Sequence, residues 1–237
     1  MKLLLSPRFS EDSVALSGAA VEAGWEVVRL QAWRTPPIDD VGAIYGETLW
    51  ARAIAGQVRK MLLEPPLDWL TRLPEEFLRR RVRHGTLAEL GSIELPAFIK
   101  PEDDKTFEAG VYSALYGFIP PTGRVLVSDV VKFVDEYRVW CLDGAAMITD
   151  PYRGPGVDLS AARDFAVEAL YVASEFTPRA AVIDVGRLDT GEWAVVETNP
   201  AFSSGIYHAL PEPILAVVAA ACVDEAPAQF SQPVELK

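Results

Sequence analysis

Residues 180–207 read AAVIDVGRLDTGEWAVVETNPAFSSGIY, and the rest of the chain is organised around them. Residues 180–185 and 193–197 are two short apolar runs of the kind that forms strands. Gly186 and the Asp-Thr-Gly cluster at residues 189–191 predict a turn between the two runs. We therefore expect the runs to pair as a β-hairpin.

One end of this hairpin carries side chains that bear oxygen. Asp184 lies near the end of the first run, Glu197 ends the second, and Asn199 follows two residues later on the same side of its strand. Two carboxylates and an amide oxygen are hard ligands that suit Mg²⁺ and leave room for substrate phosphates. Residues 203–205 (Ser-Ser-Gly) have little side-chain bulk, so backbone N–H groups there could approach an anion. A hairpin with acidic, solvated ends is the alternative interpretation.

The composition narrows the class of protein. The chain has 237 residues, 50% of them apolar, which is enough for one large domain or two small ones. Its net charge of −12 disfavours nucleic acid and anionic membranes as partners. We expect no membrane span and no signal peptide, because the apolar run in MKLLLSPRF is too short. Cys141 and Cys222 lie far apart in apolar segments, so buried thiols and a cytoplasmic setting are expected.

The first third of the chain has a strand–helix–strand pattern. Residues 2–5 and 25–30 are apolar runs, and the helical pattern of residues 11–23 begins after the candidate N-cap Ser10. This order predicts a parallel, Rossmann-like unit, with residues 42–45 as a third strand. The loop after the first strand has no G-x-G-x-x-G motif, so a dinucleotide site is not expected there.

Basic residues in two places are candidates for binding anions. Residues 79–84 read RRRVRH, and these arginines could clamp a phosphate or carboxylate, or form a solvated face. The apolar strand expected at residues 97–101 carries Lys100. A lysine in such a strand must find an anion or extend its amine to solvent.

The middle of the chain predicts a long antiparallel pair. Residues 130–142 are a β-rich run, Asp143-Gly144 is a type I′ turn signal, and residues 145–149 form the return strand. Glu136 and Arg138 share one face of their strand, either in a site or as a cross-strand ion pair facing solvent. The other expected elements are a short helix or mobile loop at 107–118, a loop at 150–155 with Arg153, a helix at 161–174 capped by Ser160, a last helix at 211–222 and a loose tail.

Several tracts in combination resemble the ATP-grasp superfamily, and within it the small R2K branch. They are LLEPPLDWL, RRRVR, PAFIKPEDDK, VSDVVKF, EYRVWCLDG and VIDVGRL…WAVVETN…SSGIY, and they cover roughly residues 40–210. The resemblance implies an α/β fold that becomes α+β in its C-terminal part. Residues 1–93 would be a Rossmann-like pre-ATP-grasp domain, residues 94–224 a two-lobed ATP-grasp domain with its hinge near 128–131, and residues 225–237 a tail.

The same resemblance implies a ligase that uses ATP and Mg²⁺. In this family ATP phosphorylates a carboxylate, and an amine attacks the acyl phosphate to give an amide and ADP. Asp184, Glu197 and Asn199 would hold Mg²⁺, and Arg138 would grip the γ-phosphate or the acyl phosphate. The other implied positions are Lys105 in the phosphate-covering loop, Arg153 as a carboxylate anchor, and Arg83, Lys100, Ser128, Asp129, Val130, Val131 and Glu136 around the nucleotide.

One departure from the family pattern leaves part of this site open. The phosphate-covering loop is usually rich in Gly and Ser, whereas residues 102–106 read EDDKT. Acidic side chains cannot themselves cradle a phosphate, so the role of Lys105 stays open.

Two other functions are kept as hypotheses beside the ligase. One is a nucleotide-binding partner or regulatory subunit without ligase chemistry, and the other is phosphoryl transfer to a hydroxyl. For the ligase, the expected partners are small-molecule or peptide carboxylates and amines, with no nucleic acid and no membrane. A homodimer is an open possibility.

Overall fold

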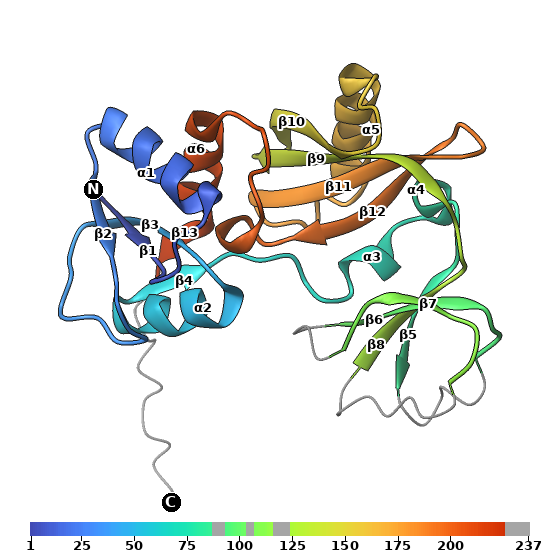
Figure 1. Cartoon of the computed structure of the whole chain (residues 1–237), viewed down its shortest axis with the longest axis horizontal. Helices are drawn as coiled ribbons and strands as arrows, with labels where there is room; N and C mark the ends of the chain where they lie inside the picture. The colour runs from blue at the N-terminus through green and yellow to red at the C-terminus, as the bar shows by residue number, and fades with distance from the viewer. Residues whose placement is uncertain (87–92, 103–106, 116–123, 226–237) are drawn as a thin grey trace, which may run out of the picture.

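The computed structural model describes residues 1–86, 93–102, 107–115 and 124–225, and its elements form three groups (Figure 1). The N-terminal group is built on three parallel strands in the order β2-β1-β3, which confirms the predicted parallel pairing. The Rossmann-like assignment of the whole region stays a prediction. The elements of this group are β1 (Lys2–Leu5), α1 (Glu11–Glu22), β2 (Glu26–Arg29), β3 (Val41–Tyr45), α2 (Thr48–Gln57) and β4 (Lys60–Leu62).

Local sequence signals determine both ends of α1. The Ser10 hydroxyl accepts a hydrogen bond from the backbone N–H of Ser13 at 3.2 Å, and the Ser13 hydroxyl accepts one from Ser10 N at 3.1 Å. The helix ends just before Gly24, whose φ of 75° is easily adopted by glycine. The buried face of α1, which includes Leu16, packs against α6 (Pro211–Ala221) from the other end of the chain.

The last described residues also join the N-terminal group. β13 (Cys222–Asp224) follows α6 directly and pairs antiparallel with β4. The predicted helix of residues 211–222 therefore ends one residue earlier, at Ala221, and residues 222–224 form a short strand. An isolated three-residue run cannot reveal such a strand without its distant partner. Residues 226–237 lie outside the described part of the chain.

The central group is an antiparallel sheet in the order β10-β9-β11-β12, with α5 (Leu159–Val172) over one face (Figure 1). Asp143 and Gly144 join its first two strands with φ values of 52° and 79°, as the predicted type I′ turn requires. The strands are β9 (Phe133–Leu142), β10 (Ala145–Arg153), β11 (Ala180–Leu188) and β12 (Trp193–Asn199).

The two faces of the central sheet have different roles. Side chains alternate along a strand, so Tyr137, Val139 and Cys141 of β9 face one way and Arg138 and Trp140 face the other. The first set is buried in a core with α5 and with the short helices α3 (Trp69–Arg72) and α4 (Glu75–Leu78). On the second face, Trp140 packs with residues of α1 and α6. The polar residues of this second face form the candidate site.

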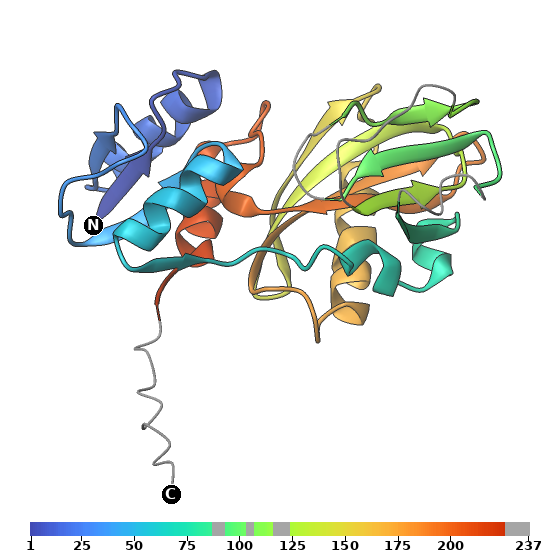
Figure 2. The same ribbon diagram turned by 90° about the horizontal axis from the view of Figure 1, so that it is seen from below.

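The third group is a small antiparallel sheet in the order β5-β8-β6-β7. It has its own core, in which Ile99 and Val127 are buried. Residues 129–132 connect it to β9, and Figures 1 and 2 show it and α5 on opposite sides of the central sheet. Its strands are β5 (Val82–Thr86), β6 (Ala97–Pro101), β7 (Gly110–Tyr112) and β8 (Arg124–Ser128).

The hairpin of residues 180–199 forms as predicted, but its turn lies later. Gly186 is inside β11, and the turn occupies residues 189–192. A Cβ at Gly186 would lie 2.5 Å from Cδ1 of Phe133 and 2.7 Å from the carbonyl oxygen of Asp135. A glycine is therefore needed at this position because β9 approaches closely. In the sequence, such a glycine resembles a turn signal.

Three other expectations are corrected. Residues 110–112 form β7 instead of a helix or loop, because they complete the edge of the small sheet beside β6. Arg153 ends strand β10 instead of lying in a loop. The cap of α5 is Asp158, whose carboxylate accepts a hydrogen bond from Ala161 N at 3.2 Å, so Ser160 lies inside the helix.

Two expectations from the composition can be compared with the structure. Cys141 and Cys222 are both free and buried, as predicted, and burial raises the pKa of the Cys222 thiol to about 11. Among the helices of the described residues, none combines the length and apolarity needed to cross a bilayer.

Candidate functional site

The centre of the candidate site is a buried pair of opposite charges, Arg138 on β9 and Asp184 on β11. The two residues face each other in the strand register. The guanidinium donates two hydrogen bonds to the carboxylate, from Nε to Oδ1 at 2.9 Å and from Nη2 to Oδ2 at 2.6 Å. The side chains are only 8% and 1% exposed, so the pair is almost completely removed from water. Such a bidentate pair fixes the orientation of both groups.

Burial and pairing act in opposite directions on this pair. Burial raises the pKa of Asp184 to about 6, although the hydrogen bonds and charge of Arg138 act to lower it. For Arg138, burial acts to lower the pKa, but the hydrogen bonds and charge of Asp184 outweigh it and raise the pKa. Arg138 therefore stays charged, whereas Asp184 can take up a proton in mildly acidic solution.

The second carboxylate, Glu197 on β12, lies opposite Asp184 in the register. It accepts a hydrogen bond from Lys100 Nζ at 2.6 Å, and Lys100 belongs to strand β6 of the small sheet. The two side chains are 32% and 23% exposed. Burial acts to raise the pKa of Glu197, but the charge and hydrogen bond of Lys100, the hydrogen bond of Asn199 and the charge of Arg138 together outweigh it and lower the pKa below its usual value. This ion pair joins the small sheet to the central sheet.

Asn199 connects the two carboxylates. Its Nδ2 lies 3.0 Å from Oε1 of Glu197 and 3.3 Å from Oδ2 of Asp184. The predicted set of Asp184, Glu197 and Asn199 thus converges in space. The donor set fits Mg²⁺, which binds one or two carboxylates together with substrate phosphates, once the amide turns its oxygen inward. Within the described residues, no group of three or more His, Cys, Asp or Glu side chains could hold a metal, so the set has only two carboxylates.

Two tyrosines that the sequence did not single out cover Arg138. The rings of Tyr152 and Tyr207 stack with centroids 5.1 Å apart and planes 12° apart. The guanidinium carbon lies 5.0 Å from the Tyr207 centroid and 5.5 Å from that of Tyr152. Arg138 also donates to the carbonyl oxygen of Gly205 at 3.1 Å. Tyr207 has a φ of 56°, which is uncommon for a residue with a side chain, and this could not be read from the sequence.

Glu136 and Arg153 form a further ion pair, and Glu136 is buried. The Tyr152 hydroxyl donates to the same carboxylate at 2.6 Å. Glu136 therefore does not pair with Arg138, although both lie on one face of β9. The alternative of a cross-strand pair holds for Glu136 and Arg153, which oppose each other between β9 and β10, but this pair extends the polar face of the site.

The predicted hinge residues connect the small sheet to the central sheet. Ser128 ends β8 and is buried, and Val130 is 44% exposed. Asp129 accepts hydrogen bonds from the Arg81 side chain at 3.0 and 3.1 Å, and these bonds lower its pKa. Val131 belongs to the segment that connects β8 of the small sheet to β9 of the central sheet. Recognition of adenine by this backbone stays a prediction.

The arginine run does not form the predicted clamp, because its side chains point to different partners. Arg79 lies 3.5 Å from Glu192, and Arg81 pairs with Asp129. Arg80 is buried and donates to the carbonyl oxygens of Leu78, Val195 and Val196 at 2.8–3.0 Å. Arg83 lies exposed on β5. Arg80, whose role the sequence missed, thus holds the backbone directly before Glu197.

The acidic loop begins with a buried carboxylate. The Glu102 side chain is 2% exposed, and its oxygens lie 2.9 Å from Arg124 Nε and 2.8 Å from His84 Nδ1, the latter without hydrogen-bond alignment. His84 Nε2 in turn lies 3.0 Å from the Thr71 hydroxyl. Glu102 is therefore part of the small sheet's structure. Lys105 and the rest of residues 103–106 lie outside the described part of the chain.

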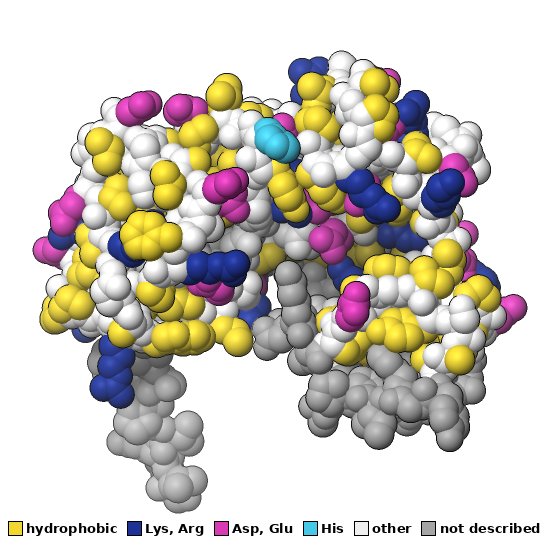
Figure 3. Space-filling model, viewed as in Figure 1, with side chains coloured by type: hydrophobic (Ala, Val, Ile, Leu, Met, Phe, Trp, Pro, Cys, Tyr) yellow, Lys and Arg dark blue, Asp and Glu magenta, His cyan; other side chains and the backbone are white. Residues whose placement is uncertain are grey.

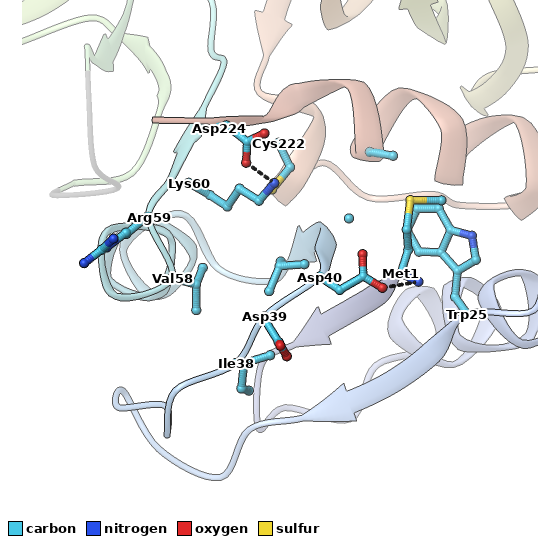
Figure 4. A pocket seen from close by; sticks show the side chains of 13 residues that line it. Met1, Trp25, Ile38, Asp39, Asp40, Val58, Arg59, Lys60, Cys222 and Asp224 are labelled. Carbon is cyan, nitrogen blue, oxygen red and sulfur yellow. Dashed lines mark hydrogen bonds and ion pairs between the residues drawn. The ribbon is translucent and has the colours of Figure 1, made fainter. Parts of the chain in front are cut away.

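One pocket of the molecule lies away from these residues. It has a volume of about 600 Å³ and opens beside the amino ends of β1 and β3, next to β4 and β13 (Figure 4). Two ion pairs lie in its lining, with the Met1 amine 2.7 Å from Asp40 and Lys60 Nζ 2.6 Å from Asp224. In contrast, Figure 3 shows the surface hollowed between the N-terminal group and the small sheet, where charged side chains gather.

Comparisons with known proteins support the fold. The chain resembles the crystal structure of a RimK domain protein from Sphaerobacter thermophilus DSM 20745, with a TM-score of 0.57, 17% identity, and coverage of 92% of this chain and 98% of that one. It also resembles D-cycloserine synthetase DcsG, with a TM-score of 0.55, 14% identity, and coverage of 92% and 99%. A third match is the ATP-grasp ligase PsnB complexed with minimal precursor, Mg and ADP, with a TM-score of 0.51, 11% identity, and coverage of 93% and 97%. No curated protein sequence matched the chain.

The family is established by sequence. The family model described as ATP-grasp domain, R2K clade family 2, matches residues 77–217, which is more than half of the chain. This region includes every strand of the small and central sheets. The chain belongs to the R2K clade of the ATP-grasp family.

Proposed function

We propose that the protein is an ATP- and Mg²⁺-dependent ligase that joins a carboxylate to an amine. The observation that carries this proposal is the convergence of Arg138 and Lys100 with Asp184, Glu197 and Asn199. Binding a nucleoside triphosphate with its metal needs cations for the phosphates and oxygen ligands for the metal. The two sheets together supply two cations, two carboxylates and an amide. Proteins of similar fold include D-cycloserine synthetase DcsG and the ATP-grasp ligase PsnB, the latter complexed with Mg and ADP.

The proposed reaction has two steps. A carboxylate oxygen of the substrate attacks the γ-phosphorus of ATP, and the bond to ADP breaks. The amine nitrogen then attacks the acyl carbon, inorganic phosphate leaves, and the nitrogen loses a proton to give the amide. Lys100 would neutralise the α- and β-phosphates, and Arg138 would hold the γ-phosphate and then the acyl phosphate.

Asp184, Glu197 and Asn199 would hold the Mg²⁺. When bound, the metal would neutralise charge that develops on the phosphate oxygens. Lys105 would cover the phosphates, Arg83 and Glu136 would lie around the nucleotide, and Arg153 would anchor a carboxylate group of the substrate. Residues 128–131 would contact adenine through their backbone.

We propose that the boundary between the two domains lies before β5, earlier than the expected residue 93. The support for this boundary is that β5 pairs with β8 of the small sheet. We propose that the region before it is a Rossmann-like domain and that α6 and β13 return to that domain. A cytoplasmic location and substrates that are small molecules or peptides belong to the same proposal.

Trapping the intermediate tests the proposal. The protein is incubated with ATP, Mg²⁺, hydroxylamine and pools of carboxylates, because hydroxylamine converts an acyl phosphate to a hydroxamate. We expect hydroxamate and ADP in equal amounts with the wild type and none with Glu197→Gln. An unimpaired Glu197→Gln variant would exclude the metal assignment.

Two alternative functions predict different products. A nucleotide-binding module would bind ATP and yield no hydroxamate with any carboxylate. Phosphoryl transfer to a hydroxyl would leave the phosphate on the acceptor, which the product mass detects. The ligase is favoured because a binding module has no need of Arg138 together with a complete metal-binding set.

A further inference from the structure

Every carboxylate oxygen of the proposed metal site already has a partner. Both oxygens of Asp184 accept from Arg138, and Oδ2 also accepts from Asn199. Oε2 of Glu197 accepts from Lys100, and Oε1 accepts from Asn199. A metal ion arriving alone would therefore share each oxygen with an internal donor, and both carboxylates already have a cation beside them that repels it.

The charges of these groups cancel. Arg138 and Lys100 contribute two positive charges, and Asp184 and Glu197 contribute two negative charges. Arg80 adds a third cation, whose charge acts on Glu197. The cluster thus has no net negative charge that would attract a free dication.

A polyphosphate, in contrast to a free metal ion, is attracted by the cations of this cluster. Its oxygens compete with the carboxylates for the same two cations, and each phosphate that replaces a carboxylate as the partner of Lys100 or Arg138 leaves that carboxylate oxygen free for a metal. Lys100 is the accessible partner, since its side chain is 23% exposed, whereas Arg138 is 8% exposed beneath Tyr152 and Tyr207. Lys100 is therefore expected to exchange first.

We propose that the nucleotide controls metal binding in this protein: its phosphates have to take Lys100 from Glu197 before a divalent cation can bind. The inference rests on the proposed function, since it assigns a binding order to that site. The Lys100–Glu197 ion pair then acts as an internal substitute for the metal in the resting protein. It also links the small sheet to the central sheet until nucleotide arrives.

The test measures the binding of each component without the other. Mn²⁺ serves as the probe for the metal, because it shares the preference of Mg²⁺ for hard oxygen ligands and has a paramagnetic signal. Free Mn²⁺ is measured by electron paramagnetic resonance in the absence of nucleotide. Calorimetry with AMP-PNP in EDTA measures nucleotide binding without metal.

The informative variant is Lys100→Met, which removes the charge and keeps most of the side-chain stem. We expect it to bind Mn²⁺ alone at least tenfold more tightly than the wild type and to bind metal-free AMP-PNP at least tenfold more weakly. Lys60→Met is the matched control, because Lys60 forms an ion pair of the same 2.6 Å length with Asp224, away from the site. The control should leave both affinities unchanged.

The outcomes separate the binding order from the proposed function. If the wild type binds AMP-PNP without metal and binds Mn²⁺ alone as tightly as Lys100→Met does, the binding order is wrong and the nucleotide site stands. If the wild type binds AMP-PNP under neither condition, with or without Mg²⁺, both proposals fall. Thermal unfolding of each variant shows that the comparison is made between folded proteins.

Discussion

The buried pair of Arg138 and Asp184 provides the sharpest test of the site's geometry. Replacing Arg138 with Met leaves the Asp184 carboxylate, which is 1% exposed, buried without its charged partner. Asp184→Asn likewise leaves the Arg138 guanidinium buried without a negative charge beside it. Removing one member of a buried pair costs about 3–5 kcal/mol, because the other charge stays desolvated and unpaired. This is a large part of the roughly 5–15 kcal/mol that stabilises a typical domain.

The double variant Arg138→Met/Asp184→Asn should recover most of that loss. It buries no net charge, and the methionine can pack against the rings of Tyr152 and Tyr207 that cover Arg138. Urea unfolding of the wild type, both single variants and the double variant completes a double-mutant cycle. We expect a coupling of at least about 2 kcal/mol, judged against the 0.5–3 kcal/mol usual for residues in contact. Single losses below about 1 kcal/mol that simply add in the double variant would refute the reasoning.

Three further predictions follow from the same structure. Folding raises the pKa of Asp184 from 3.8 to about 6, so the folded state binds more protons between these pH values and the free energy of unfolding should fall by up to about 3 kcal/mol as the pH rises from 4 to 6; unfolding curves of Asp184→Asn that keep the full slope would contradict this origin. Gly186→Ala should destabilise by about 1–3 kcal/mol because its Cβ meets Phe133 and the Asp135 carbonyl, whereas Gly18→Ala in α1, with open space around it, should stabilise by about 0.5–1 kcal/mol; equal effects in urea unfolding would show that Gly186 is not constrained. Cys141 and Cys222 are buried and burial raises both thiol pKa values, so Ellman's reagent should label neither in the native protein and both in urea; rapid native labelling would place a thiol at the surface.

The hairpin with its three polar residues could be predicted from the sequence because its information is local. Two apolar runs separated by a turn cluster fix which residues oppose each other, and Asp184 does face Glu197 in the register. The sequence analysis assigned Gly186 to the turn. The structure shows that a glycine is needed there because Phe133, on the neighbouring strand β9, leaves no room for a side chain. From the sequence alone, a glycine required by a close neighbour in the sheet cannot be distinguished from a glycine in a turn.

The side-chain partners were harder to predict than the strands. The pattern placed Glu136 and Arg138 on one face of β9, but only the fold shows that Glu136 pairs with Arg153 and Arg138 with Asp184. The arginine run looked like one clamp, yet its members separate because the chain turns there, with Arg79 at a φ of 52°. Tyr207, after β12, itself has a left-handed φ of 56°, which the periodicity of the sequence does not predict.

The central claim is that a nucleotide binds between the small and central sheets through Lys100. The most direct measurement is calorimetric titration of AMP-PNP with Mg²⁺ into the wild type, Lys100→Met and the control Lys60→Met. A hydrogen bond to a charged group contributes about 1.5–3 kcal/mol, so we predict that Lys100→Met binds about 10- to 150-fold more weakly and that Lys60→Met binds as the wild type does. Equal affinity of Lys100→Met and the wild type, or no binding by the wild type, would contradict the account.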